Sequence, residues 1–411
     1  MEATVNMLKV AFIGDVLFPI PDIKGGAIST LVTGIINENE KHPELDITVF
    51  SADCDGLLEC HNQYRFTKFH RIGKPDKLIK LKVLFWRMIR KLTGYRVQYK
   101  NAFMMMVNRL LRNEQYDVIV YENSALEMMQ AKRYKNTKNI MHIHADYINS
   151  DMNGINYLCR HCDCVMGVSD FITSKMEEIP ALKGKGVTLK NAIDLTGFTP
   201  KHRPEDGEGI RESLGLSEND FVVLFCGRLS KEKGCLELIK AVERVPDVKL
   251  LIVGGENFSS NARTEYVECL YNEAEKIKDR IVFTGHIKHS EVIRYYNIAD
   301  IAVVPSICNE AASLTLLEYR ATGLPTIASQ MGGIPEYCNK NTTLLVEYNE
   351  SFIEGLAEAI QLLKCDDMLR DRMSEQATLD LEQFGYTSYY KNFVDIIANV
   401  SSESKEYLNG N

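Results

Sequence analysis

Short, mostly apolar runs without regular polar alternation recur along this chain, and they narrow its possible folds more than any other feature. In the first half they are separated by helical or turn-rich segments, and the five runs are Leu8–Ile13, Asp46–Ser51, Tyr116–Tyr121, Asn139–His144 and Cys164–Ser169. A strand that is apolar on both faces has to be covered on both faces, as in a parallel sheet enclosed by helices. The first half therefore predicts a doubly wound α/β domain.

The same pattern starts again after a break in composition. Residues 195–219 carry Pro, Gly and charged side chains without any period, which is typical of a linker. Beyond it the apolar runs return as Phe221–Phe225, Lys249–Val253, Arg280–Phe283, Ile301–Pro305, Leu324–Ala328 and Thr343–Val346. We therefore expect two Rossmann-like domains, residues 1–194 and 220–384, with ligands at the carboxyl ends of the strands in an interdomain cleft. We also expect a helical tail, about 385–411, to pack back on the first domain.

Composition and charge exclude several classes of protein. The chain has 411 residues and a net charge of −8, whereas a nucleic-acid-binding surface is basic. No run approaches the ~20 apolar residues of a membrane span, and Glu2 stands where an export signal would be basic. Eleven cysteines scattered over the chain fit reduced thiols better than a disulfide framework. We therefore expect a cytoplasmic protein without a nucleic-acid partner.

The densest group of cysteines is Cys159, Cys162 and Cys164. A structural zinc site needs four ligands, which usually come as two spaced pairs, and no second pair lies at a suitable distance in the sequence. Residues 163–169 also have the pattern of a buried strand, which would place Cys164 in the core. We expect no metal site here.

A strand end, a glycine turn and two cations five residues apart define the loop Gly227–Gly234, with the sequence GRLSKEKG. The planar guanidinium of Arg228 can hold two phosphate oxygens, and Lys233 adds a point charge. A helix that starts near Gly234 adds the positive end of its dipole. The loop is a candidate anion site, although a solvated basic turn has the same pattern.

Two glutamates lie on either side of a predicted helix start, after the fourth apolar run of the second domain. Glu310 lies in a loop, and Glu318 lies one to two turns into a helix that begins near Ser313. The free amides of Ser313, Leu314 and Thr315 would face an anion, while the carboxylates would accept hydrogen bonds from hydroxyl groups. Because carboxylates repel a diphosphate, sugar hydroxyls on either side of it are their natural partners. The alternative is an ordinary helix that carries a glutamate in its first turns.

Taken together, these residues resemble the retaining glycosyltransferases of the GT-B fold, family GT4 (glycosyltransferase group 1). The matching motifs follow one order along nearly the whole chain: Gly25-Gly26, Val168-Ser169, Asn191-Ala192-Ile193-Asp194, Gly227–Gly234, the pair Glu310 and Glu318 with seven residues between them, and Gly332–Glu336. The resemblance implies two Rossmann-like domains with an interdomain cleft. It also implies an enzyme that transfers a sugar from a nucleotide diphosphate.

The resemblance implies a role for each matching residue of the donor site. Arg228 and Lys233 would hold the donor diphosphate. Glu310 would contact hydroxyls of the donor sugar, and Glu318 would contact the ribose. Backbone groups that would face the donor are those of Gly25, Gly26, Ile287, Ser313, Leu314 and Thr315.

One histidine of the first domain also matches the family. His144, at the end of a predicted strand, would lie near the transferred sugar. We expect His142, on the same strand, to point to the opposite face.

The mechanism implied by the resemblance is departure of the diphosphate with retention of configuration. Charge grows on the leaving phosphate, so fixed cations and helix amides stabilise the transition state more than the ground state. Arg228 and Lys233 would do the work of a divalent ion, and we expect neither a metal nor a cofactor besides the nucleotide sugar. Asp53-Cys54-Asp55 resembles the D-x-D metal motif of the other glycosyltransferase fold, but its position after the second strand favours a polar turn.

The expected reaction follows from the family's usual donors. It is transfer of a hexose or N-acetylhexosamine, from a UDP-sugar with GDP-sugars second, to a glycan or lipid-linked acceptor in cell-surface polysaccharide synthesis. The chain departs from the family pattern at Ala311-Ala312-Ser313, usually Pro-Phe-Gly, and at Asn191-Ala192, usually Asn-Gly. The alternative is a catalytically silent partner or glycan-binding subunit of a transferase complex. The four charged donor residues, all present, argue against it.

Residues 74–100 concentrate Lys and Arg with aliphatic residues and the only tryptophan, Trp86, in an otherwise acidic chain. A basic amphipathic helix of this kind can lie on an anionic membrane surface, which would suit a lipid-linked acceptor. The alternative is a helix whose apolar face packs on the first domain. The sequence leaves both interpretations open.

Overall fold

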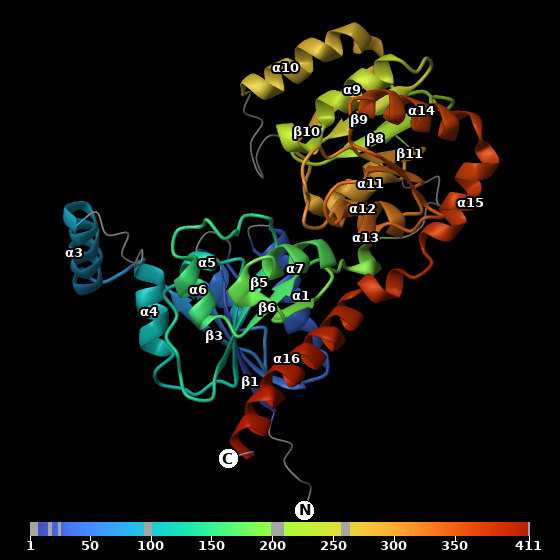
Figure 1. The fold of residues 1–411 in the computed structure, drawn as a ribbon. Helices are drawn as coiled ribbons and strands as arrows, with labels where there is room; N and C mark the ends of the chain where they lie inside the picture. Colours follow the sequence, from blue (N-terminus) through green and yellow to red (C-terminus); the bar gives the residue numbers. More distant parts are fainter. Residues whose placement is uncertain are drawn as a thin grey trace, which may run out of the picture. The chain divides into compact units, whose positions relative to one another are not determined.

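The computed structural model describes residues 7–14, 19–23, 26–93, 101–198, 209–255 and 264–409. The chain forms two compact units, Met1–Asn191 with Tyr386–Asn411, and Ala192–Gly385. Each unit contains one sheet whose paired strands all run parallel, with helices between successive strands (Figure 1). The prediction of two Rossmann-like parallel-sheet domains is therefore confirmed.

The first sheet has seven strands in the order β3-β2-β1-β4-β5-β6-β7. They are β1 Leu8–Ile13, β2 Leu45–Ala52, β3 Lys68–Ile72, β4 Val118–Glu122, β5 Lys138–Ile143, β6 Cys164–Gly167 and β7 Gly186–Thr188. The apolar runs predict the five central strands, but β3 and β7 escape prediction. Both lie at the edges of the sheet, where a strand is less fully covered and needs no continuous apolar run.

The helices of the first unit include one that comes from the far end of the chain. They are α1 Ala27–Lys41, α2 Leu57–His61, α3 Lys77–Thr93, α4 Ala102–Leu110, α5 Ala125–Met128, α6 Ile155–His161, α7 Asp170–Glu177 and α16 Tyr386–Asn409, with a 3-10 turn at Pro180–Leu182. Helix α16 packs along α1 (Figure 1). No helix in the described ranges is long and apolar enough to cross a membrane.

Helix α16 contributes side chains to the core of the first unit. Phe393 is fully buried and stacks on Phe12 of β1, with ring centroids 5.4 Å apart. The Tyr390 hydroxyl donates a hydrogen bond of 2.6 Å to Oδ1 of Asn39 on α1, and this contact is buried. The last helix therefore completes the first unit rather than the second.

The second sheet has six strands in the order β10-β9-β8-β11-β12-β13. They are β8 Val222–Cys226, β9 Lys249–Val253, β10 Ile281–Gly285, β11 Ile301–Val304, β12 Thr326–Ser329 and β13 Thr343–Val346. From β8 the chain continues to β9 and β10 on one side of the sheet, and β11, β12 and β13 then follow on the other side of β8. The strand order therefore reverses between β8 and β11. In sheets of this kind, loops at the carboxyl ends of the two strands at the reversal diverge and leave a crevice.

Helices cover both faces of the second sheet (Figure 1). One face is covered by α9 Cys235–Glu243, α10 Glu265–Ala274 and α14 Phe352–Cys365. The other is covered by α11 Val292–Tyr296, α12 Leu314–Ala321 and α13 Ile334–Tyr337. The remaining helical segments are α8 Ile210–Ser213, α15 Asp367–Ala377 and the 3-10 turns Leu195–Gly197, Lys231–Lys233, Glu275–Arg280, His289–Glu291 and Leu381–Phe384.

The segment 195–219, expected as a linker, lies in the second unit where it is described. Its residues 199–208 lie outside the described ranges. Arg211 of α8 ties the segment to the domain, because its guanidinium donates hydrogen bonds to the carbonyls of Ile298, at 2.8 Å, and Ser217, at 2.9 Å.

Truncation of the tail's buried aromatic ring should destabilise the first unit. We expect Phe393→Ala to lower the free energy of unfolding by about 3–5 kcal/mol, because it removes a stacked core ring and leaves a cavity. The exposed neighbour Lys391 provides the control, and Lys391→Ala should change stability by no more than about 0.5 kcal/mol. Urea unfolding followed by circular dichroism measures both, and equal stabilities would contradict the assignment of α16 to this core.

Candidate active site

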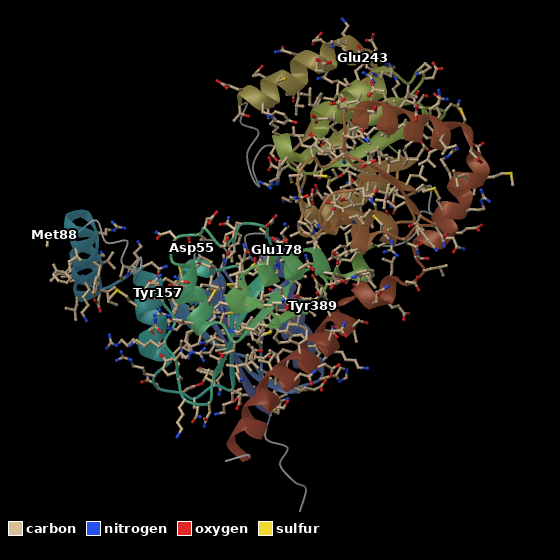
Figure 2. All side chains as sticks on the ribbon, in the orientation of Figure 1. Asp55, Met88, Tyr157, Glu178, Glu243 and Tyr389 are labelled. Carbon is tan, nitrogen blue, oxygen red and sulfur yellow. The ribbon has the colours of Figure 1, made fainter. Side chains whose placement is uncertain are left out.

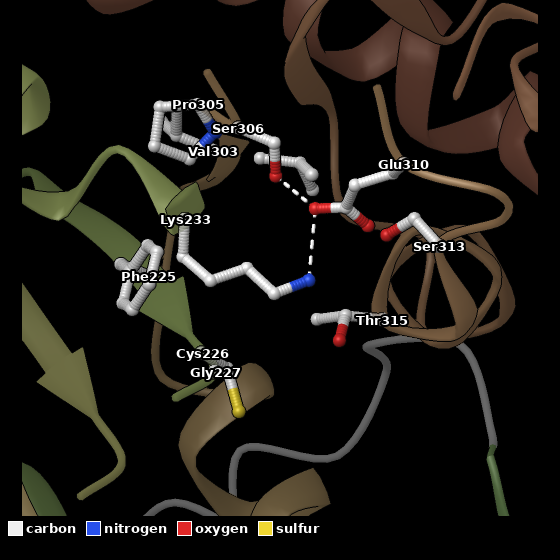
Figure 3. A pocket seen from close by; sticks show the side chains of 11 residues that line it. Phe225, Cys226, Gly227, Lys233, Val303, Pro305, Ser306, Glu310, Ser313 and Thr315 are labelled. Atoms are coloured by element: carbon white, nitrogen blue, oxygen red, sulfur yellow. Dashed lines mark hydrogen bonds and ion pairs between the residues drawn. The ribbon is translucent and has the colours of Figure 1, made fainter. Parts of the chain in front are cut away.

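The crevice at the reversal of the second sheet holds the main group of polar residues. Its lining comes from the loop after β8, the loop after β11 and the start of α12 (Figure 3). The lining residues are Phe225, Cys226, Gly227, Lys233, Val303, Val304, Pro305, Ser306, Glu310, Ser313 and Thr315. The structure thus brings together four residues that the sequence singles out, namely Lys233, Glu310, Ser313 and Thr315.

An ion pair joins the two loops of this crevice. Lys233 Nζ lies 2.8 Å from Glu310 Oε1, and the hydroxyl of Ser306 donates to the same oxygen (Figure 3). The Glu310 side chain is only 7% exposed and that of Lys233 27%. A carboxylate buried to this degree needs donors, and the lysine and serine supply two. Ser306 carries no motif, so sequence reasoning missed it.

Two glycines allow the loops to approach closely enough for this pair to form. Gly234 has φ +68°, and a Cβ atom there would lie 1.8 Å from the carbonyl oxygen of Pro305. Gly332 has φ +56°, and a Cβ atom there would lie 2.4 Å from the carbonyl oxygen of Glu310. Both positions therefore require glycine for steric as well as conformational reasons. Gly234, which ends the Gly227–Gly234 loop, and Gly332, which begins the Gly332–Glu336 motif, therefore shape the crevice.

The first turn of α12 faces the same crevice through Ser313 and Thr315. Ser313 is the N-cap, and its hydroxyl accepts a hydrogen bond from the amide of Leu316. The N–H groups of a helix's first turn have no intrahelical acceptor, so the helix start offers donors to an anion. Serine at the position where the family usually has glycine thus has a structural role as the cap of this helix.

Glu318 lies apart from the lining of this crevice, and both its oxygens have donors. Oε1 accepts from His289 Nε2 and Oε2 from the Tyr296 hydroxyl, each at 2.7 Å. The Glu318 side chain is 8% exposed, whereas that of His289 is 71% exposed. His289 begins the 3-10 turn just beyond Ile287, the residue expected near the nucleobase. No sequence signal distinguishes His289 or Tyr296 from ordinary surface and core residues.

Arg228 is the predicted phosphate ligand with the most exposed side chain. Its guanidinium lies 3.6 Å from the Glu232 carboxylate, and its side chain is 46% exposed. Neither Arg228 nor Leu314 is among the crevice-lining residues. Gly25 lies outside the described residues, while Gly26 is the N-cap of α1 with φ 137°.

In the first unit, three titratable side chains meet at the carboxyl ends of β4 and β5. Glu122 and His142 are direct partners in the strand register, and His144 follows β5. Glu122 Oε2 lies 3.0 Å from His142 Nδ1 and 3.1 Å from His144 Nε2. The two histidine nitrogens are 3.2 Å apart. Glu122 and His142 are almost completely buried.

This geometry corrects the expectation that His142 and His144 point to opposite faces of the strand. The centroids of their rings are 4.1 Å apart, so the two rings lie on the same side. Strand side chains alternate with a period of two, and residues two apart therefore share a face. The alternation turns the residue between them, Ile143, to the other face of the sheet, where it is fully buried.

Each group's protonation follows from its burial and its neighbours. Burial alone would raise the pKa of Glu122, but the electrostatic attraction and hydrogen bond of His142 and the hydrogen bond of His144 lower it to about 2. Burial lowers the pKa of His144 to about 4, His142 acting in the same direction and Glu122 in the opposite one. At neutral pH the site therefore holds a carboxylate beside a neutral His144.

These three residues are also the one group in the described ranges whose possible metal-ligand atoms converge, all within 4.8 Å. Histidine nitrogen and glutamate oxygen are ligands that zinc accepts. The cysteine cluster does not form such a group. Cys162 donates its thiol to the carbonyl of Cys164 at 3.1 Å, and burial raises the pKa of this thiol.

Solved structures of other proteins have the same architecture as this chain. The structure of a glycosyltransferase from Rickettsia africae matches with a TM-score of 0.74 at 19% identity, covering 96% of this chain and 99% of that one. The structure of Anabaena HepE in complex with UDP matches with a TM-score of 0.72 at 17% identity, covering 96% and 100%. The two-domain fold is that of the GT-B glycosyltransferases.

Comparison of amino-acid sequences also finds glycosyltransferases. The family described as Glycosyl transferases group 1 matches residues 206–380. The putative glycosyltransferase YtcC of Bacillus subtilis is 26% identical over 389 residues, which cover 91% of this chain and 88% of YtcC. The chain is a glycosyltransferase, and its residues 206–380 resemble the group 1 family.

The first unit should lose stability on mild acidification because of His144. Its pKa is about 6.5 in the unfolded chain and about 4 in the folded one. The unfolded chain therefore binds more protons between these values, and stability falls as pH decreases through this window. We expect His144 to lower the free energy of unfolding by about 1–2 kcal/mol between pH 7 and pH 5.

Comparison of two proteins isolates this contribution from other titrations. Urea unfolding of the wild type and of His144→Gln at both pH values gives four free energies. The wild type should lose about 1–2 kcal/mol more than the variant on going from pH 7 to pH 5. An equal loss in both would mean that His144 is not held neutral by burial.

Proposed function

We propose that this enzyme transfers a hexose or N-acetylhexosamine, with retention, from a UDP-sugar to a glycan or lipid-linked acceptor in cell-surface polysaccharide synthesis. The observation that carries the proposal is the Lys233–Glu310 pair, held in a crevice at the strand-order reversal of the second unit. A cation and a carboxylate next to a helix start suit a ligand with a phosphate at one end and hydroxyl groups at the other. The UDP complex of the structurally similar HepE supports UDP as the carrier.

The donor diphosphate would bind to Lys233, Arg228 and the amides of residues 313–315. Glu310 holds the ammonium of Lys233 in the crevice, where a phosphate can reach it. Arg228 is half-exposed, and its 3.6 Å pair with Glu232 lies within its own loop, so a diphosphate can reach its guanidinium as well. These cations would replace a divalent ion, and the reaction would need no metal.

The sugar and the nucleoside would bind to the two carboxylates. Glu310 keeps Oε1 for Lys233 and Ser306, which leaves Oε2 as an acceptor for sugar hydroxyls. Glu318 would accept from the ribose, and its donors His289 and Tyr296 fix its orientation. His144 of the first unit would contact the transferred sugar, and the backbone of Gly25, Gly26 and Ile287 would complete the donor contacts.

In the reaction, the bond between the anomeric carbon and the phosphate oxygen breaks while the acceptor hydroxyl oxygen bonds to the same carbon from the same face. The hydroxyl proton passes to the leaving diphosphate. Because negative charge on that diphosphate increases at the transition state, Lys233 and Arg228 accelerate the step by stabilising it there.

Removal of the crevice cation tests this function most directly. We expect Lys233→Ala to reduce kcat/KM for the nucleotide sugar at least 100-fold, or about 3 kcal/mol of transition-state stabilisation. Lys231 is an exposed lysine in the same 3-10 turn, and Lys231→Ala should stay within about threefold of the wild type. The assay is hydrolysis and transfer with a panel of UDP- and GDP-sugars in the presence of EDTA.

The same assay distinguishes the alternatives. Activity that survives EDTA and disappears in Lys233→Ala supports a metal-independent transferase. Activity that EDTA abolishes would contradict the role given to the cations. If the folded wild type binds no nucleotide sugar at all, the chain is a silent subunit instead.

We infer that helix α3 contacts the inner face of the cell membrane through its anionic lipids. Leu78, Leu81, Leu84, Phe85 and Met88 are each at least 51% exposed, and Met88 is labelled on this helix in Figure 2. They recur at helical spacing and so form one stripe, while Ile79 is buried. The stripe lies among lysines and arginines, as in helices that lie on anionic lipid. Residues 94–100 of the predicted basic segment lie outside the described ranges.

A charge in the apolar stripe should release the protein from vesicles. We expect Leu81→Glu/Phe85→Glu to reduce sedimentation with phosphatidylglycerol vesicles at least tenfold, because both side chains would lose their burial in lipid. Leu362 on α14, 47% exposed, is a matched apolar residue of the other unit, and Leu362→Glu should bind like the wild type. Equal binding by the double variant would sink the membrane assignment.

A further inference from the structure

We propose that Glu122 is a positioning residue that holds His144 in the tautomer protonated on Nε2, so that Nδ1 is a hydrogen-bond acceptor for a sugar hydroxyl. The role of His144 at the sugar rests on the proposed function, whereas its tautomer does not. Three contacts among Glu122, His142 and His144 carry the inference, together with the atoms around them that have no partner.

The three atoms in contact form a triangle, and their protons are too few to make all three contacts hydrogen bonds. Glu122 Oε2, His142 Nδ1 and His144 Nε2 lie 3.0 to 3.2 Å from one another. Each ring nitrogen carries at most one proton, and a carboxylate carries none. At most two of the three contacts are therefore hydrogen bonds, and the tautomers decide which two.

The geometry places a proton on Nδ1 of His142 and none on Nε2. His142 Nε2 is buried without a hydrogen-bond partner among the described residues, so a proton there would be a buried donor without an acceptor. The remaining proton lies on Nδ1, which faces Glu122 Oε2 at 3.0 Å and donates to it. Nδ1 of His142 then has no lone pair to offer, and it cannot accept a hydrogen bond from His144.

The carboxylate of Glu122 also determines which ring nitrogen of His144 carries the proton. Glu122 is completely buried and its Oε1 has no hydrogen-bond partner in the described part of the chain, so its charge depends on donors to Oε2. A lone pair on His144 Nε2, 3.1 Å from this oxygen, would add repulsion, whereas an N–H there adds a second donor. The favoured arrangement therefore has two imidazole N–H groups on one carboxylate oxygen. Because His144 is neutral, its Nδ1 carries only a lone pair.

The backbone around His144 holds the ring in place for this role. Asn123 takes the left-handed conformation, φ +48°, and donates its amide to the carbonyl of His142 at 2.7 Å. Its Oδ1 in turn accepts the amide of His144 at 3.1 Å. His144 Nδ1 has no partner among the described residues, and the side chain keeps 7% of its surface exposed. One ring nitrogen is thus fixed to the protein and the other left for a ligand.

A transition metal held by the same three residues is the rival interpretation. A metal on Nδ1 of His142 would leave the proton on Nε2, where metal-binding histidines normally donate to a second partner. His142 Nε2 is buried and has no such partner in the ranges that the structure describes. The two-proton arrangement needs no such partner, and so the geometry favours it over a metal.

The tautomer is measured directly by ¹⁵N NMR of the full chain labelled on its nine histidines. The signals of His144 are those that disappear in His144→Gln. We expect Nε2 of His144 at the shift of a protonated nitrogen and Nδ1 at that of an unprotonated one near pH 7. In Glu122→Gln, whose amide can donate to Nε2, the two shifts should exchange at least in part. Protonated Nδ1 in the wild type, or unchanged shifts in Glu122→Gln, would overturn the proposal.

Kinetics then separate positioning from structure. We expect Glu122→Gln to lower kcat about 10- to 100-fold, the range found when the hydrogen-bond partner that orients a metal-binding histidine is replaced. KM for the nucleotide sugar should stay within about threefold. Glu127, a buried carboxylate that accepts from Ser124 and Asn101, is the matched control, and Glu127→Gln should keep kcat within about threefold. An exchanged tautomer with wild-type kcat would overturn the role at the sugar. One equivalent of bound zinc, lost in Glu122→Gln, would establish the metal instead.

If the wild type shows no activity with any sugar nucleotide, the proposed function fails and NMR still decides the tautomer. Thermal melting of the three Gln variants confirms that they are folded. The two failures are thus distinguishable in the same set of samples.

Discussion

A partly buried ion pair between Lys233 and Glu310 is the interaction on which the crevice of the second unit depends. It connects the loop after β8 to the loop after β11, the two loops that diverge where the strand order reverses. Without it the crevice would contain a nearly buried carboxylate with only Ser306 as donor and an ammonium free to move into solvent. The pair therefore keeps opposite charges next to each other in the crevice.

The backbone around this pair is under tight steric control. Gly234 and Gly332 each pass so close to a carbonyl of the facing loop that no side chain fits. Tyr319 adds a further tie, because its buried hydroxyl accepts the amide of Cys226 at the end of β8 at 2.8 Å. The Tyr319 side chain thus serves both packing and backbone hydrogen bonding. Ser313, which departs from the family pattern, caps α12.

The first unit stabilises its buried carboxylate in the same physical way. Glu122 is held by donors that converge on one oxygen, and these donors are imidazoles rather than an ammonium. A histidine has two nitrogens, so a hydrogen bond to one fixes the state of the other. A lysine ammonium has a single nitrogen, so a hydrogen bond to it fixes no second site. The two buried carboxylates therefore have different roles. Glu310 holds the ammonium of Lys233 in place, and Glu122 fixes the tautomer of His144.

Local patterns in the amino-acid sequence were enough to predict the two parallel-sheet domains and four of the residues that line the crevice, Lys233, Glu310, Ser313 and Thr315. Continuous apolar strands admit few arrangements, and Lys233, Glu310 and Ser313 lie in local patterns that loop and helix chemistry explain. Edge strands β3 and β7 escaped because strands at a sheet edge need no apolar run. Folding in three dimensions was needed to bring Ser306 to Glu310, His289 to Glu318 and Glu122 to His144, and to place His142 beside His144. Hydrogen bonds between residues far apart in the chain depend on strand register and loop path, which no local pattern encodes.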